Sequence, residues 1–206
     1  MSYKVLQPGL LSSIQDLGRF GQHDIGLTTG GPLDNEAFLW ANRILHNVPN
    51  ASAIELSFGG LQLLAQTSSY LCVTGAQLDL TINGVEKALW TSHKILPDDE
   101  IKLGYSSHGC RSYVSVAGGF NINPSFGSSA TVVREKVGGI AGAKLAANDC
   151  LPCSRITQLP RQALAPEHRP LYAQKNTNRR DGNTVLRLLP GYQHHLFDAA
   201  TRARFF

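Results

Sequence analysis

The residues best suited to chemistry gather near the start of the chain. Gln15, Asp16 and Arg19 lie close together, and Asp34 and Asn42 follow a glycine-rich run. A guanidinium binds carboxylates and stabilises developing negative charge, whereas an aspartate can accept a proton. Glycines allow tight turns and close approach of the backbone to a ligand. The pattern predicts either a binding pocket or a polar loop in which the charged groups pair and Asp34 caps a helix.

A short strand and a helix must position this segment, which we call the Ser13–Asn42 block. An extended piece over Leu10–Ile14 leads into the block, and a helix is predicted over Asn35–His46, with Asp34 as its N-cap. Asn42 lies at the edge of the apolar face of this helix. A buried amide needs hydrogen-bond partners, so we expect the polar groups of the preceding loop to supply them.

Short strand signals dominate the rest of the first 120 residues. The run at residues 70–74 is expected to stop at Gly75, and Asn83-Gly84 predicts a tight hairpin. Many short strands with one convincing helix predict a mainly β fold, an antiparallel barrel with one principal helix. The strands are expected at Tyr3–Leu6, Ala53–Phe58, Leu61–Ala65, Tyr70–Thr74, Leu78–Ile82, Trp90–Leu96, Glu100–Leu103 and Cys110–Val116.

Composition narrows the function classes. The 206 residues carry a net charge of +4 at pH 7, but Lys and Arg are scattered, and their local excess at 161–180 lies in a Pro-rich stretch typical of a solvated linker. No apolar run has the length of a bilayer span, and the start shows no signal-peptide pattern. We expect a cytoplasmic protein that binds neither nucleic acid nor membrane.

Two further sequence patterns, a CxxC and several glycine-rich segments, do not indicate a metal site or a nucleotide site. Cys150 and Cys153 form a CxxC, but no second pair completes a zinc site and no strand-to-helix junction of the thioredoxin type precedes it. We expect reduced thiols and no bound metal. The glycine-rich segments at 117–119, 127–131 and 138–142 match neither a P-loop nor a dinucleotide fingerprint.

Ordered blocks of the sequence resemble one known family. They are Gly9–Gly21, Gly30–Asp34, Ala41–Asn42, Ala53–Glu55, Gly59–Gly60, Thr74–Ala76, Tyr113–Gly119, Gly127–Ser128, Gly138–Gly139, Leu145–Leu151 and Leu186–Phe197. This pattern resembles the biotin-dependent carboxyltransferase family, also called allophanate hydrolase subunit 2, which includes the C subunit of 5-oxoprolinase and KipA. The resemblance implies cyclophilin-like barrel modules: a barrel domain over 1–155, a linker or surface excursion over 156–184, and the partial start of a second, apparently truncated module over 185–206.

The resemblance also implies a function. The expected role is that of the C subunit in an ATP-dependent 5-oxoprolinase complex that converts 5-oxoproline to glutamate with B-subunit (KipI-like) and A-subunit homologues. ATP would act at the level of the complex, and biotin is not expected on this chain. Two alternatives stay open: a non-catalytic, KipA-like regulatory partner of a B-subunit homologue, and a urea- or allophanate-type carboxyltransferase domain. Exposed strand edges in an incomplete module would also favour self-association.

The residues and the resemblance together give a set of site residues. The expected catalytic residues are Asp16, Arg19 and Asp34, and the expected substrate-binding residues are Gln15, Gly18, Gly31, Pro32, Asn42, Glu55, Gly119 and Ser128. The family usually has Arg where this chain has Ser129 and Ala143, and neither side chain can bind a carboxylate as a guanidinium does. We therefore expect the chain to be inactive when it is alone.

Overall fold

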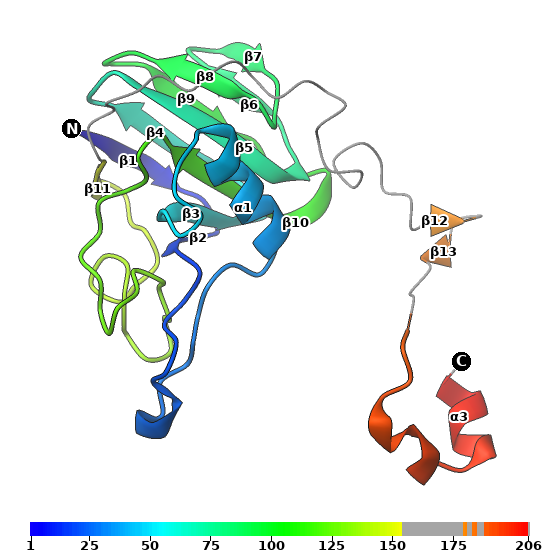
Figure 1. The fold of residues 1–206 in the computed structure, drawn as a ribbon. Helices are drawn as coiled ribbons and strands as arrows, with labels where there is room; N and C mark the ends of the chain where they lie inside the picture. The colour runs from blue at the N-terminus through cyan, green and yellow to red at the C-terminus, as the bar shows by residue number, and fades with distance from the viewer. Residues whose placement is uncertain (154–178, 181–182, 185–187, 206) are drawn as a thin grey trace. The chain divides into compact units, whose positions relative to one another are not determined.

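The structure, a computed structural model, describes residues 1–153, 179–180, 183–184 and 188–205. Contacts divide the chain into two units, Met1–Arg169 and Pro170–Phe206 (Figure 1), and each is described by itself. The elements of the first unit are β1 (Ser2–Pro8), β2 (Leu11–Gln15), η1 (His23–Ile25), α1 (Asn35–Ile44), β3 (Ala53–Ser57), β4 (Leu61–Ala65), β5 (Ser69–Gln77), β6 (Leu80–Ile82), β7 (Val85–Lys87), β8 (Ser92–Ile95), β9 (Glu100–Leu103), β10 (His108–Val116) and β11 (Cys150–Pro152). Those of the second are β12 (Arg179–Arg180), β13 (Asn183–Thr184), η3 (Tyr192–Leu196) and α3 (Ala199–Phe205).

The strands of the first unit form two antiparallel sheets. One has the order β11-β1-β4-β9-β6-β7, and the other has the order β2-β3-β10-β5-β8. The mainly β, antiparallel class predicted from the sequence is confirmed, although the sheets do not close into a barrel. In the second unit, the two short strands β12 and β13 pair with each other.

The hydrophobic core of the first unit is built from the inward faces of both sheets. Val5 and Leu63 come from the first sheet, and Ile54, Val73 and Val114 come from the second; all five are fully buried. Strand β4 alternates between buried and half-exposed residues, as a strand with one wet face does. The alternating residues of β4 therefore place every second side chain on the face of the sheet that packs into the core.

Helix α1 covers the outer face of β5 and β10 (Figure 1). The rings of Phe38 and Tyr113 meet edge to face with centroids 5.9 Å apart, and the Thr74 hydroxyl donates to the Ala37 carbonyl at 2.7 Å. Because the helix covers one face and the core covers the other, residues 112–116 of β10 are all buried. The helix is thus fixed against the sheet from which several site residues come.

The expectation that a strand stops at Gly75 is wrong, because β5 continues to Gln77. The residue has φ 98°, and a Cβ at this position would lie 2.4 Å from the Arg111 carbonyl oxygen. The register between β5 and β10 also shifts between His108 and Ser112. The glycine thus accommodates a bulge inside the strand rather than a turn that ends it.

The helix begins where predicted but ends two residues early, at Ile44. His46 has φ 56°, a conformation that breaks the helix, and the Asn47 amide donates to the Asn42 carbonyl at 2.9 Å. This left-handed residue closes the last turn, as happens at many helix C-termini.

None of the four cysteines, all of which lie in the described residues, forms a disulfide. Cys150 is exposed and Cys153 is buried, and burial raises the pKa of the Cys153 thiol. In the described part of the chain, no three His, Cys, Asp or Glu side chains gather closely enough to hold a metal ion. The absence of a metal or redox role stays a prediction.

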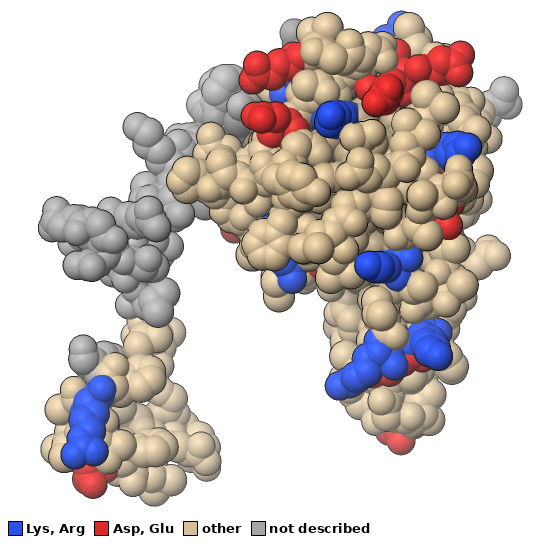
Figure 2. All heavy atoms as spheres, turned by 180° about the vertical axis from the view of Figure 1, so that it is seen from behind, with Lys and Arg blue, Asp and Glu red and all other residues tan. Residues whose placement is uncertain are grey.

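None of the described helices has the length and hydrophobicity needed to span a membrane. On the face shown in Figure 2, acidic and basic side chains are interspersed over the first unit. The predicted linker 156–184 lies almost wholly outside the described residues, so the domain boundaries at 155 and 185 stay predictions.

Candidate functional site

Gln15 ties two glycine-rich segments together at the end of β2. Its amide oxygen accepts from the Gly31 N–H at 3.2 Å, and its amide nitrogen donates to the Thr131 carbonyl at 3.2 Å and to the Ser13 hydroxyl at 3.1 Å. The side chain is 5% exposed, so these bonds replace the water it loses on burial. Gln15 thus fixes the 30–31 turn beside the segment that follows residue 127.

Asp16 is a buried carboxylate whose hydrogen-bonding capacity is well filled. One oxygen accepts from the Gly18 N–H at 2.9 Å and from the Ser128 hydroxyl at 2.5 Å. The other accepts from the Ser129 N–H at 2.7 Å and from the Ser129 hydroxyl at 3.1 Å. Four donors around one carboxylate replace the water that it loses on burial. Asp16 therefore joins the Ser13–Asn42 block to the 127–131 segment.

Arg19 is only 1% exposed, and most of its guanidinium nitrogens lack a hydrogen-bond partner among the described residues. Nη2 donates to the Ala130 carbonyl at 2.5 Å, while Nε and Nη1 have no hydrogen-bond partner among the described residues. The two ion pairs in this part of the chain are Arg111–Glu55 and Arg134–Glu135. The alternative in which Asp16 and Arg19 pair with each other is therefore not the arrangement in the structure.

Glycine is required where these loops touch. Gly31 has φ 97°, and a Cβ there would lie 3.0 Å from the Leu17 carbonyl oxygen. At Gly138 a Cβ would lie 2.0 Å from the Ala130 carbonyl oxygen and 2.8 Å from Arg19 Nη2. No other residue fits such contacts without moving the backbone.

A second group holds the start of α1. The Glu55 carboxylate on β3 accepts from the Leu33 N–H at 2.8 Å and from the Tyr113 hydroxyl at 2.7 Å, and Arg111 Nε lies 3.6 Å from it. The Tyr113 hydroxyl in turn accepts from the Asp34 N–H at 2.7 Å. Burial, followed by the neighbouring charge of Glu55, raises the pKa of Tyr113 above its ordinary value. The tyrosine is therefore a neutral donor to Glu55.

Asp34 caps the helix, as predicted. Its Oδ1 accepts from the Ala37 N–H at 3.0 Å, and the residue is partly exposed. Capping uses one carboxylate oxygen. The other oxygen has no described hydrogen-bond donor, so capping leaves it able to accept a proton.

Asn42 contradicts the expectation about its partners. Its amide nitrogen donates to the Ala51 carbonyl at 2.9 Å, and its oxygen accepts from the Asn47 amide at 3.0 Å and the Ser115 hydroxyl at 2.7 Å. These groups come from the loop after the helix and from β10, not from the loop before it. Gly119 lies in the turn after β10, where its N–H donates to the Val116 carbonyl at 2.9 Å.

The structure therefore sorts the predicted site residues into three hydrogen-bonded groups. The first contains Gln15, Asp16, Gly18, Arg19, Gly31 and Ser128, the second contains Asp34 and Glu55, and the third contains Asn42 and Gly119. Pro32 makes none of the described hydrogen bonds and lies between the first two groups in the sequence. Within the described residues, no hydrogen bond links the third group to the first. The first two groups are joined through the 30–34 backbone and form the candidate site.

Sequence reasoning missed Tyr113 and Thr131. Tyr113 lies in a predicted strand, where an aromatic residue is ordinary, and its link to Glu55 and Asp34 depends on tertiary pairing between β3 and β10. Thr131 follows a Gly-Ser-Ser-Ala run that gave no reason to single out its hydroxyl. Only the fold shows that Thr131 is 6% exposed and that its hydroxyl has no hydrogen-bond partner among the described residues.

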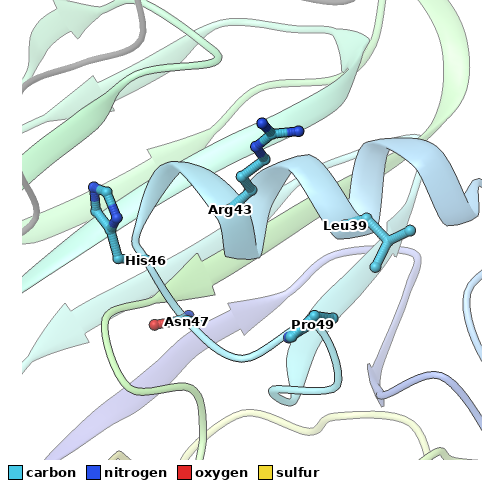
Figure 3. A pocket seen from close by; sticks show the side chains of 5 residues that line it. All are labelled: Leu39, Arg43, His46, Asn47 and Pro49. Atoms are coloured by element: carbon cyan, nitrogen blue, oxygen red, sulfur yellow. The ribbon is translucent and has the colours of Figure 1, made fainter.

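A separate hollow lies beside the C-terminal end of α1, with a volume of about 400 Å³ (Figure 3). It is lined by Leu39, Arg43, His46, Asn47 and Pro49. Arg43 also lies over the Trp40 ring, 4.7 Å from its centroid. None of the predicted site residues lines this hollow, so it is distinct from the candidate site.

Comparison with known proteins gives the family. Residues 25–206 match the family described as carboxyltransferase domain, subdomain A and B, and the chain belongs to this family. It is 30% identical over 204 residues to the C subunit of 5-oxoprolinase from Escherichia coli, covering 98% of this chain and 62% of that protein. It is 33% identical over 140 residues to the C subunit of 5-oxoprolinase from Haemophilus influenzae, covering 68% of this chain and 45% of that protein.

A solved structure agrees with this assignment. The urea amidolyase of K. lactis superposes with a TM-score of 0.73 at 30% identity, covering 80% of this chain and 10% of that one. The chain thus spans less than two thirds of each of these relatives.

Proposed function

We propose that this chain has the role of the C subunit in an ATP-dependent 5-oxoprolinase complex and acts with B- and A-subunit homologues. The observation that carries the proposal is the alignment with the E. coli 5-oxoprolinase protein, which extends over 98% of this chain. ATP would be bound and hydrolysed at the level of the complex, with no biotin attached to this chain. Alone, the chain is expected to be inactive.

The geometry supports different roles for the three proposed catalytic residues. Arg19 is the buried cation that can bind the carboxylate of 5-oxoproline or stabilise negative charge on its lactam oxygen. Asp34 is the proton acceptor, because its carboxylate is partly exposed and capping occupies one oxygen. Asp16 is a positioning residue, since four donors already surround its carboxylate.

A second candidate is a urea-type carboxyltransferase, favoured by the structural similarity to the K. lactis urea amidolyase. Urea and the lactam of 5-oxoproline share a planar amide group, so the same site chemistry suits both. The carboxyltransferase function would require a biotin carrier on another chain.

Reconstitution of the complex tests the proposal. The chain is combined with B- and A-subunit homologues, and ATP hydrolysis is measured with 5-oxoproline, with urea and without substrate. We expect stimulation by 5-oxoproline that is lost when this chain is omitted. Stimulation by urea in the presence of bicarbonate and a biotin carrier would support the second candidate. If neither substrate stimulates hydrolysis, the enzymatic proposal is wrong.

A further inference from the structure

Three buried polar atoms of the candidate site lack partners. Arg19 Nε, Arg19 Nη1 and Thr131 Oγ1 have no hydrogen-bond partner among the described residues, although the two residues are only 1% and 6% exposed. A buried donor without an acceptor is costly, and a buried charge is costlier. Such groups are therefore rare unless something else binds them.

Two adjacent glycines lie against the Arg19 and Thr131 side chains. A Cβ built on Gly138 would lie 2.8 Å from Arg19 Nη2, and one built on the next residue, Gly139, would lie 2.1 Å from Thr131 Oγ1. On another side, a Cβ at Gly30 would lie 3.4 Å from Arg19 Nη1. The Arg19 guanidinium and the Thr131 hydroxyl thus both lie against the backbone of the adjacent residues Gly138 and Gly139, while the side chains of Ala130 and Val132 lie beside Gly30 together with Arg19 Nη1.

The unpartnered groups have the chemistry of an anion site. The guanidinium always carries a positive charge, and neither ion pair of the described residues includes it. The nearest acid in sequence, Asp16, already accepts from four donors. A hydroxyl and a guanidinium that lack acceptors favour a negatively charged oxygen ligand over a neutral one.

We propose that Arg19 and Thr131 form a binding site for a carboxylate, covered by the backbone of Gly30–Gly31. The inference rests on the proposed function, for which the ligand is the carboxylate of 5-oxoproline, and it adds Thr131 as a specificity residue for that group. The lactam ring would then lie toward Asp34, which follows the covering turn in the chain.

Entry to the site requires a small backbone movement. Gly30 is exposed, and its backbone lies beside Arg19 Nη1 together with the side chains of Ala130 and Val132. The Gln15 amide oxygen accepts from the Gly31 N–H at 3.2 Å, and the Thr29 carbonyl just before the turn accepts from the Arg19 N–H at 2.7 Å. Opening of the turn toward solvent would break the first of these bonds.

The test is ligand-dependent thermal unfolding of the full chain, with and without its Thr131 hydroxyl. The probes are acetate and 5-oxoproline, and their neutral amides, acetamide and 5-oxoprolinamide, serve as controls. A ligand that binds the native state raises its unfolding temperature in a saturable way. We expect saturable stabilisation by both carboxylates and none by the amides.

Thr131→Val should weaken carboxylate binding roughly tenfold or more, because a hydrogen bond to a charged group is lost. Without ligand this variant should be at least as stable as the wild type, because it removes a hydroxyl that has no partner. The matched control is Thr74→Val, whose hydroxyl donates to the Ala37 carbonyl at 2.7 Å. Thr74→Val should lower the unfolding temperature and leave carboxylate binding unchanged.

The outcomes separate this inference from the proposed function. Equal carboxylate affinity in the wild type and Thr131→Val, or no saturable stabilisation of the wild type, would overturn the site. If the complex still hydrolyses ATP with 5-oxoproline in that case, the proposed function stands without it. If acetate binds through Thr131 but 5-oxoproline does not, the carboxylate site stands and the proposed substrate is wrong.

Discussion

The two buried charged residues of the Ser13–Asn42 block have opposite surroundings. The Asp16 carboxylate accepts four hydrogen bonds and joins two loops, whereas the Arg19 guanidinium donates one hydrogen bond and has two nitrogens without a partner among the described residues. The fold explains the four donors around Asp16, because a carboxylate that is buried without hydrogen-bond partners would be costly. The same argument does not explain Arg19, because two nitrogens of its buried guanidinium have no hydrogen-bond acceptor among the described residues. This difference leads us to assign support to Asp16 and ligand binding to Arg19.

Tyr113 gives a pH-dependent prediction at this scale. Burial and Glu55 raise its pKa above the ordinary value of 10.0, so the folded chain keeps this proton at a pH where the unfolded chain loses it. The folded state then binds more protons, and its stability falls as the pH rises above about 10. The loss is at most about 1.4 kcal/mol per pH unit for each such tyrosine.

Tyr113→Phe should reduce the steepness of this alkaline loss without removing it, because burial also raises the pKa of Tyr3. At neutral pH the variant should be less stable by about 1–3 kcal/mol, since the Asp34 N–H loses its acceptor. Urea unfolding at pH 8, 10 and 11 measures both effects. Identical pH slopes for wild type and variant would contradict this account.

At the scale of elements, local patterns predicted strands better than they predicted polar partners. Strands β4 and β9 have the predicted bounds because alternation alone defines a strand with one wet face. The Asn83-Gly84 hairpin was also correct, because both residues need positive φ. Gly75 and Asn42 were misread, since a bulge and a buried amide depend on the neighbouring strand or loop, which sequence spacing does not reveal.

Asp34 tests whether a helix cap also takes part in chemistry. Asn caps helices about as well as Asp, so Asp34→Asn should change stability by less than about 0.5 kcal/mol. If Asp34 accepts a proton, the same change should lower turnover of the reconstituted complex by roughly 100-fold. Asp34→Ala is the comparison that loses both the cap and the carboxylate, and it should also lower stability by about 1 kcal/mol. Full turnover in Asp34→Asn would leave Asp34 as a cap only.

At the scale of the whole molecule, composition and strand density predicted the mainly β class, and ordered blocks of residues predicted the family. The separation into two sheets was not predicted, because which strands lie next to each other depends on long-range pairing. The second unit exposes several large apolar side chains, among them Leu189, Tyr192 and Phe205. Such surfaces mark interaction sites in many proteins.

These exposed side chains give a prediction about assembly. Leu189 is 95% exposed and Tyr192 is 87% exposed, so replacing both with Ser should weaken self-association or binding of the B-subunit homologue tenfold or more. The matched control replaces Leu10 and Val48, which are 62% and 70% exposed in the first unit. Light scattering and sedimentation measure association. A wild-type chain that stays monomeric and binds no such homologue would refute the prediction.

The central claim is that this chain supplies the substrate site of a 5-oxoprolinase-type complex through the Ser13–Asn42 block. The most direct test is 5-oxoproline-dependent ATP hydrolysis by the complex carrying Arg19→Lys, with Arg43→Lys on the outer face of α1 as control. Lys keeps the charge but loses the planar array of donors. We predict that Arg19→Lys lowers turnover roughly 100-fold while complex formation and unfolding temperature stay near wild type. Wild-type turnover in Arg19→Lys, or a loss explained by failure of the complex to form, would contradict the claim.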